Sequence, residues 1–435
     1  MTKRFLKLEL YRLWGNPSHL DYVAASLRER YGSVRLYILA AEGNAGNFTY
    51  DGIELGGERL AHEAEETLHA LAGGGHKITK LSVVGYSLGG LVARYALGLL
   101  YARGWLERLE PVNFTTFASP HVGVRTPLKG IQNHMWNVLG ARTVSMSGRQ
   151  LFMIDSFRET GKPLLCILAD PESIFIKALA QFKNRCLYAN VANDRSTVFY
   201  TTGITTFDLF PDVENTNFNY ARGYEPVVID SEMYTLPSEG KESMPLHHSH
   251  TWGKTRRTVA NFPFLVFLLF ITPVGSIFFL LNAVVQTLRS RQRIRLHEQG
   301  KSGVLLGSYR SFPLLVQDVQ SAVEDVFENV NSSQDPNYLS PIDEPDSFET
   351  SQASKEEDQG FPQSSHLENI HPTLALTPAQ FAIVDTLNTV GFRRHPVYIH
   401  NHRHSHAAII VRVPKKGFEE GKIVIKHWLD NEFEV

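Results

Sequence analysis

The sequence has few cysteines, no excess of charge of one sign and no apolar leader at its start. Its 435 residues include only two cysteines, Cys166 and Cys186, so no disulfide framework is implied and a reducing compartment is expected. Lys plus Arg (43) nearly balance Asp plus Glu (45), which removes the positive field typical of nucleic-acid binding. The first ten residues are interrupted by charges and lack the apolar run of a secretory signal. We therefore expect a protein on the cytosolic side that does not bind nucleic acid.

Composition divides the chain into four parts. Over residues 1–230, apolar runs of strand length alternate with helix-like periodic segments, which is typical of βαβ units and a parallel sheet. Residues 231–330 form an insertion that contains an uncharged run from Phe262 to Val285. Residues 331–372 hold nine acidic residues against one lysine, so we expect a disordered acidic linker. Residues 373–435 recover ordered sequence and are expected to complete the α/β core.

The coarse secondary structure follows from periodicity and end signals. Thr377 and Pro378 predict a helix that begins with a threonine N-cap and a proline at its first position. Strands are expected at six apolar runs, namely Val34–Ala40, Leu81–Gly85, Val112–Phe117, Arg185–Val191, Val397–His400 and Ala407–Val413.

A G-x-S-x-G pattern, Gly85-Tyr86-Ser87-Leu88-Gly89, lies between an expected strand and an expected helix. The run Leu81–Val84 precedes it, and apolar residues recur at helical spacing from Leu88 to Leu99. This context predicts a nucleophile elbow, a sharp turn that lifts the Ser87 hydroxyl above the sheet and points the Leu88 N–H at a developing oxyanion. A βα turn of another doubly wound protein is the alternative interpretation.

A serine nucleophile needs a base and an acid that orients the base, in the chain order Ser, Asp or Glu, His. The expected strand Arg185–Val191 is followed at once by Asp194, at the C-terminal edge of a parallel sheet. Asp170 and Asp208 compete, but neither follows so clear a strand. An ordinary Asx-turn is the alternative role for Asp194. The histidine-rich segment 400–406 supplies the base, and His406 is expected because it directly precedes an apolar run.

The same histidines allow a different interpretation. His402, His404 and His406 alternate, so an extended segment would project all three to one face as a possible metal site. No cysteine and no acidic residue lies between Thr386 and Val413 to complete such a site. A solvated basic loop is the third possibility. We expect no metal and no cofactor.

Several sequence blocks resemble the eukaryotic putative serine esterase family of the α/β-hydrolase superfamily, and within it the fungal lipid-droplet phospholipases. The blocks spread over most of residues 11–230 and 375–430, and they read LWGNPSHLDYVAASLRERY, NFTYDGIELGGERLAHE, VVGYSLGGLVARYALG, FTTFASPHVGVR, YANVANDRSTVFYTTGI and HSHAAIIVR. The resemblance implies an α/β-hydrolase fold in which Ser87 is the nucleophile, Asp194 the acid and His406 the base. It also implies a glycerolipid or phospholipid substrate.

One block departs from the family. Where relatives carry His-Gly-Leu-Trp-Gly-Asn after a first strand, this chain has Tyr11-Arg12-Leu13-Trp14-Gly15-Asn16. The His-Gly pair allows the tight turn through which the next N–H, that of Leu13 here, would face the oxyanion. Arg12 lacks the conformational freedom of glycine at positive φ. A catalytically impaired adaptor on a membrane or lipid droplet is therefore the alternative to a lipid-directed serine hydrolase.

Two further segments carry expectations about lipid. About 60 apolar-rich residues, roughly 124–184, lie between two strands where this fold often places a lid, although helices packed into the core are equally compatible with them. Phe262–Val285 is broken near its middle by Pro273 and Gly275 and is flanked by basic residues on both sides. Because a single span would place one basic flank on the disfavoured side, we expect a membrane hairpin on lipid droplets and endoplasmic reticulum, facing the cytosol. Oligomeric state is left open.

Overall fold

A parallel sheet of six strands organises the molecule, whose computed structural model describes residues 3–10, 17–32, 35–124, 145–235, 285–297, 299 and 371–435. The strand order is β2-β1-β3-β4-β5-β6, and every neighbouring pair is parallel. Parallel neighbours joined by helical crossovers define the α/β class, so the fold class expected from the sequence is confirmed.

The strands are β1 (Lys3–Leu10), β2 (Leu36–Ala40), β3 (Lys77–Tyr86), β4 (Glu110–Phe117), β5 (Asn184–Asn190) and β6 (Arg393–Val397). Four of the six expected strands are confirmed, with ends that move by a few residues. The strand expected at Val397–His400 ends at Val397 instead of beginning there. Two arginines, a histidine and Pro396 make β6 unlike a buried strand in sequence, and the sheet tolerates them because β6 is an edge strand.

The strand expected at Ala407–Val413 is wrong. Ser405–Ala408 forms a short helix, α15, and the chain then turns, with Val411 at a positive φ of 52°. Ile409, Ile410 and Val411 are nevertheless almost completely buried. A run that is buried on all sides shows no period, so its sequence cannot distinguish a strand from a helix followed by a turn.

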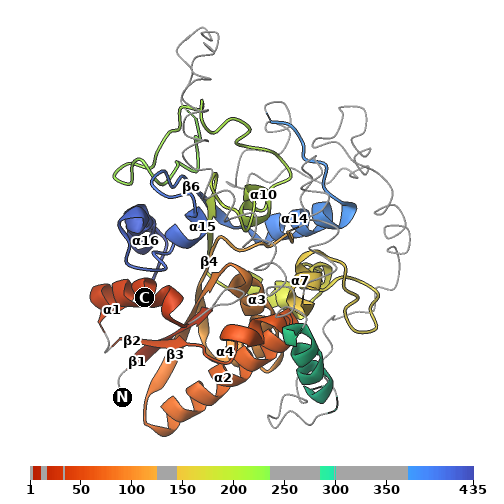
Figure 1. Cartoon of the computed structure of the whole chain (residues 1–435). Helices are drawn as coiled ribbons and strands as arrows, with labels where there is room; N and C mark the ends of the chain where they lie inside the picture. Colours follow the sequence, from red (N-terminus) through yellow and green to blue (C-terminus); the bar gives the residue numbers. More distant parts are fainter. Residues whose placement is uncertain are drawn as a thin grey trace, which may run out of the picture.

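Helices cover both faces of the sheet (Figure 1). One apolar cluster joins the sheet to α1 (Asp21–Tyr31) and α16 (Glu419–Asn431), and a second joins the other face to α2 (Ile53–Gly73), α3 (Leu88–Ala102), α9 (Ile174–Ala180) and α14 (Pro378–Val390). The Thr377 N-cap and the first-position Pro378 predicted at the start of α14 are confirmed, with the Thr377 hydroxyl accepting from the Gln380 amide. Shorter elements are η1 (Pro17–Leu20), η2 (Gly46–Tyr50), α4 (Trp105–Arg108), α7 (Met146–Leu151), α8 (Leu164–Leu168), α10 (Phe199–Gly203) and η7 (Lys416–Phe418).

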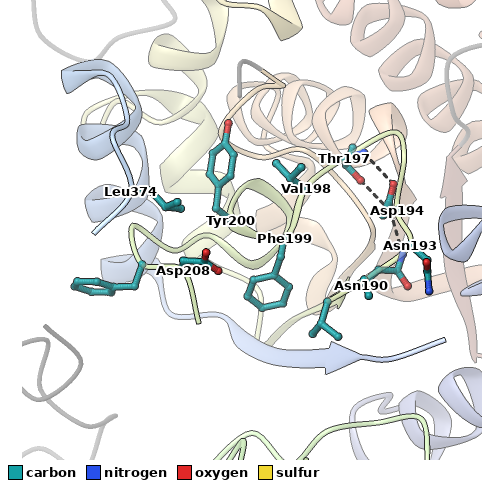
Figure 2. Close-up of a pocket in the computed structure, with 12 residues that line it drawn as sticks. Asn190, Asn193, Asp194, Thr197, Val198, Phe199, Tyr200, Asp208 and Leu374 are labelled. Carbon is teal, nitrogen blue, oxygen red and sulfur yellow. Dashed lines mark hydrogen bonds between the residues drawn. The ribbon is translucent and has the colours of Figure 1, made fainter. Parts of the chain in front are cut away.

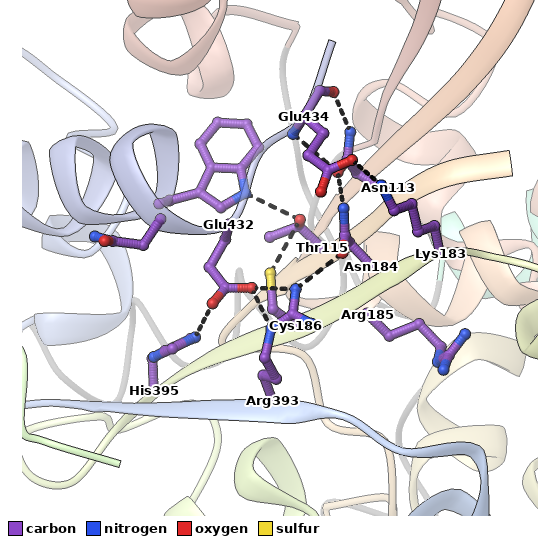
Figure 3. Close-up of polar contacts among 12 residues, drawn as sticks. Asn113, Thr115, Lys183, Asn184, Arg185, Cys186, Arg393, His395, Glu432 and Glu434 are labelled. Carbon is purple, nitrogen blue, oxygen red and sulfur yellow. Dashed lines mark hydrogen bonds and ion pairs between the residues drawn. The ribbon is translucent and has the colours of Figure 1, made fainter. Parts of the chain in front are cut away.

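Buried polar contacts hold α16 against β6 and against the central strand β4. The Glu432 carboxylate lies between Arg393, at 2.7 Å, and His395, at 3.1 Å (Figure 3). The Trp428 indole donates to the Thr115 hydroxyl at 3.0 Å. Burial opposes ionisation of Glu432, but the hydrogen bonds from His395 and Arg393 outweigh it and lower its pKa to about 2. The ionised carboxylate therefore stabilises the packing of α16 against β6.

The expected lid and the expected membrane segment are only partly described. Residues 125–144 of the lid lie outside the described residues, whereas Leu151, Phe152 and Phe157 are buried, Leu151 and Phe157 within the main apolar cluster, which favours core helices for this part. Residues 262–284 and the linker 331–370 also lie outside the described residues. Within the described parts, no helix is long and apolar enough to cross a membrane.

Candidate active site

Ser87 occupies a strained turn between β3 and α3. Its backbone has φ 54° and ψ −129°, a region that residues with a side chain rarely adopt. The turn is tight enough that a Cβ at Gly85 would lie 2.5 Å from the Cα of Gly90, so only glycine fits there. The strand–turn–helix geometry expected of a nucleophile elbow is present, and it holds the Ser87 hydroxyl at the carboxyl edge of the sheet.

The structure brings the three residues predicted from the sequence into one hydrogen-bonded series. His406 Nε2 lies 3.0 Å from Ser87 Oγ, and His406 Nδ1 lies 2.8 Å from Asp194 Oδ2. Ser87 is 6% exposed and His406 3%. With Nδ1–H donating to the carboxylate, Nε2 is free to accept the Ser87 proton, which is the arrangement that general-base activation of a serine requires.

The Asp194 carboxylate is held by more than the imidazole. Oδ1 accepts from the backbone amides of Ser196 and Thr197 at 2.8 and 2.9 Å, and Oδ2 accepts from the Asn190 side chain at 3.0 Å. Burial raises the pKa of Asp194, but the nearby His406 and these hydrogen bonds outweigh it and lower the pKa below its usual value. The carboxylate is therefore ionised and fixed in orientation at neutral pH. The two ring nitrogens of His406 face Asp194 and Ser87, so neither Asp170 nor Asp208 is the acid of this series.

Three positioning residues were missed in the sequence analysis. The Thr197 hydroxyl donates to Asp194 Oδ2 at 3.1 Å, and Asn190 contacts the same oxygen. The Tyr86 hydroxyl donates to the His406 carbonyl at 2.8 Å, and its ring centroid lies 5.1 Å from that of the imidazole. The Asp-x-Ser-Thr sequence is a signal for the Asx-turn at Asp194. The contact of Tyr86 with a residue 320 positions away has no local signal.

Of the two expected oxyanion donors, only Leu88 lies within the described residues. Leu88 is the first residue of α3, where a backbone N–H has no acceptor within the helix and is available to an anion. Leu13 lies outside the described residues. The last residue of β1, Leu10, pairs with Gly85, so β1 ends beside the strand that carries the elbow.

Two hollows border the loop that carries Asp194. A cavity of about 250 Å³ is lined by Asn190, Asp194 and the segment from Thr197 to Tyr200 (Figure 2), but neither Ser87 nor His406 lines it. A larger cleft of about 550 Å³ is lined by His406 itself, together with Arg195, His402 and Lys415. Unlike the cavity, the cleft reaches the imidazole that pairs with Ser87.

The histidine cluster does not converge on one point. His406 is directed at Ser87 and Asp194, while the ring centroids of His402 and His404 lie 5.5 Å apart in the cleft. Within the described ranges, no three Cys, His, Asp or Glu side chains are gathered as metal ligands would be. The geometry thus assigns His406 to the series with Ser87, not to a set with His402 and His404.

The chain is similar to proteins described as putative serine esterases and putative lipases. Residues 11–206 match the family model described as Putative serine esterase (DUF676), which confirms the resemblance found in the sequence. The chain is 27% identical over 246 residues to Putative lipase C4A8.10 of Schizosaccharomyces pombe, covering 53% of this chain and 30% of that protein. It is 32% identical over 174 residues to Putative lipase ROG1 of Saccharomyces cerevisiae, covering 39% of this chain and 24% of that protein.

These relatives are much longer than the matched segments, so the chain spans less than a third of the length of either. Among solved structures, a phospholipase PlaB from Legionella pneumophila in complex with thio-NAD is similar over 45% of this chain and 39% of that chain. Its TM-score is 0.27 and its sequence identity 8%.

Proposed function

We propose that this protein is a lipid-directed serine hydrolase that cleaves acyl esters of glycerolipids. The observation that carries the proposal is the hydrogen-bonded series from Ser87 through His406 to Asp194, with Ser87 in a strained elbow. The family match and the lipases among the relatives support the ester class of substrate.

The geometry supports an acyl-enzyme mechanism. Ser87 Oγ attacks the ester carbonyl while His406 Nε2 takes its proton, and the Leu88 N–H stabilises the oxyanion of the tetrahedral intermediate. His406 then donates the proton to the leaving alcohol. A water molecule, deprotonated by the same imidazole, releases the fatty acid from Ser87. Throughout, Asp194 holds the Nδ1–H tautomer and stabilises the imidazolium.

A fluorophosphonate probe tests this mechanism directly, because it reacts only with an activated serine. We expect covalent labelling of the purified protein at Ser87, identified by mass spectrometry of the modified peptide. The same preparation should release fatty acid from a glycerolipid ester, which extends the test from the serine to the substrate. Labelling at another serine, or a correctly folded protein that does not label, would contradict the proposal.

A second function, an impaired adaptor that retains the fold, rests on one observation. Tyr11-Arg12 replaces the His-Gly pair of the family, and loss of one oxyanion donor typically lowers kcat by about 10²–10³. The double change Tyr11→His with Arg12→Gly separates the two functions. A rise in kcat by that factor indicates an enzyme limited by its oxyanion loop, whereas absence of turnover in both proteins favours the adaptor.

We also propose that the protein acts at the cytosolic face of lipid droplets and endoplasmic reticulum, attached through Phe262–Val285. The described helix that follows, residues 285–297, supports this location. Its inner face is fixed to the core by Arg293, which pairs with the buried Asp51 at 2.6 Å, and by His297, which lies 2.7 Å from Glu58. Its outer face carries exposed Val285 and Leu288 beside three further arginines, Arg289, Arg291 and Arg295.

Deletion of residues 262–285 should release the protein from both membranes, and deletion of the equally long segment 331–354 should not. Glycosylation tags placed on either side of the run should both remain unmodified, because a hairpin keeps both flanks in the cytosol. Modification of one tag would establish a single span instead.

A further inference from the structure

The cleft beside His406 is lined by cations from both loops of the proposed triad. Arg195 follows the acid Asp194 directly, while Arg412 and Lys415 follow the helix that carries the base. His402 and His404 complete this side of the cleft, and no carboxylate occurs among the described residues that line it. Neither Arg195 nor Arg412 forms an ion pair with any residue that the structure describes. We call this set of five side chains the cationic cleft.

Two side chains of the cationic cleft, His402 and Lys415, direct hydrogen-bond donors at each other. His402 Nδ1 accepts the backbone N–H of His404 at 3.0 Å, so the proton of the neutral imidazole must be on Nε2. Nε2 lies 3.4 Å from the Lys415 ammonium, which can only donate. Burial and the charges of Lys415 and His404 lower the pKa of His402. An anionic acceptor placed between Nε2 and Nζ would satisfy both donors at once.

The His402 ring is held in this position by its neighbours. The Phe418 ring meets it edge-on, with centroids 4.8 Å apart. A Cβ at Gly417 would lie 2.8 Å from His402 Cδ2, so glycine leaves the room that the imidazole occupies. The contacts with Phe418 and Gly417 thus favour the position of the imidazole beside Lys415.

We propose that the cationic cleft binds the phosphoryl group of a phospholipid whose acyl ester is attacked by Ser87. The inference rests on the proposed function and narrows its substrate class. A phosphodiester carries one negative charge over two non-bridging oxygens, which match the paired N–H groups of a guanidinium and the two opposed donors. A monoacylglycerol has no such group. Since His406 lines the same cleft, a phosphoryl group held there keeps the rest of the lipid near the reacting atoms.

Binding can be measured without turnover in the Ser87→Ala protein. We would titrate it by calorimetry with dihexanoyl phosphatidylglycerol, with dihexanoylglycerol and with inorganic phosphate. Arg412→Gln combined with Lys415→Gln should raise the Kd for the phospholipid at least tenfold. The matched control is Arg403→Gln with Lys416→Gln, which removes the same charges from exposed neighbours that do not line the cleft, and should change the Kd less than twofold.

Each alternative has its own result. Equal losses of affinity for the phospholipid in the two double variants would indicate general electrostatic attraction to the surface. Tighter binding of inorganic phosphate than of the phospholipid would indicate a site for the free ion. Either result overturns the inference. Equal binding of dihexanoylglycerol overturns it as well. Lys415→Arg, which keeps the positive charge, should retain most of the affinity that Lys415→Gln loses. Thermal unfolding of every variant shows whether a loss of affinity comes from misfolding.

Kinetics separate this inference from the proposed function. In the active protein, the ratio of kcat/KM for phospholipid to kcat/KM for a neutral ester should fall about tenfold in Arg412→Gln with Lys415→Gln, mainly through KM. An unchanged ratio in an enzyme that hydrolyses both esters overturns the phosphoryl subsite and leaves the hydrolase intact. Absence of ester hydrolysis and of fluorophosphonate labelling refutes the hydrolase, whereas the calorimetry still decides whether the cleft binds the lipid.

Discussion

The described parts of the molecule contain two serine–histidine–carboxylate series, and they differ in what the serine can do. Besides Ser87, His406 and Asp194, the structure places Ser231 Oγ 3.2 Å from His395 Nδ1, and His395 Nε2 3.1 Å from Glu432. The Ser231 hydroxyl donates to the Arg394 carbonyl at 2.6 Å, so its proton is already committed and the imidazole cannot remove it. The Ser87 hydroxyl instead forms its hydrogen bond with His406 Nε2.

The carboxylates differ as well. Glu432 is shared between His395 and the Arg393 guanidinium, which neutralises it and ties α16 to the sheet. Asp194 faces one imidazole, and its remaining acceptor positions are taken by backbone amides and uncharged side chains. Ser87 also starts a helix, whereas Ser231 lies in an irregular segment. Three side chains within hydrogen-bonding distance are therefore insufficient, because the serine proton and the nearby oxyanion donors decide the chemistry.

The largest expected difference between the two series is in covalent labelling. Ser87→Ala should abolish fluorophosphonate labelling. In the described parts of the chain, no other serine both pairs with an imidazole nitrogen that can accept its proton and keeps that proton from a backbone carbonyl. Ser231→Ala should label like the wild type, measured by gel fluorescence at equal protein. Loss of labelling in Ser231→Ala with an unchanged melting temperature would reverse the two assignments.

The two acids should differ nearly as much. Asp194→Asn keeps the shape of the side chain but no longer fixes the Nδ1–H tautomer, so kcat for ester hydrolysis should fall by about 10⁴. Glu432→Gln should leave kcat within about twofold of the wild type when assayed well below its melting temperature. Similar losses in both variants would show that the Glu432 series also supports turnover.

Glu432 should instead be visible in the acid dependence of stability. Its pKa is about 2 in the fold against an ordinary 4.5, so its contribution is complete above pH 4.5 and is lost as pH falls towards 2. This difference between the two pKa values corresponds to about 3 kcal/mol in the free energy of unfolding. Urea unfolding between pH 7 and 3 should show a shallower decline for Glu432→Gln. Glu66→Gln, whose side chain is 69% exposed, serves as the matched control.

The smallest expected effect concerns Tyr86, which positions the base through one hydrogen bond. Tyr86→Phe removes the donor to the His406 carbonyl and keeps the ring contact. A neutral hydrogen bond contributes about 1 kcal/mol, so kcat should fall roughly fivefold with KM unchanged. A change in KM alone would place Tyr86 in substrate binding instead.

Local geometry could be predicted from the sequence where short patterns determine it. The elbow at Ser87 and the Asx-turn at Asp194 are each encoded within a few residues, and chain order then narrowed the base to a histidine cluster. The second series could not be anticipated, because Ser231, His395 and Glu432 share no local pattern and meet only through the packing of α16. The segment after His406 was misassigned since complete burial removes the periodicity on which strand and helix predictions depend.

The position of His406 has a consequence for synthesis of the protein. It lies 212 residues after Asp194 and reaches Ser87 only once β6 has joined β5 and α16 has packed beside α1. A nascent chain on the ribosome therefore carries the serine long before it carries the imidazole that activates it. If Ser87 is the nucleophile, lipid hydrolysis cannot begin before residues 371–435 have been made and have folded onto the sheet.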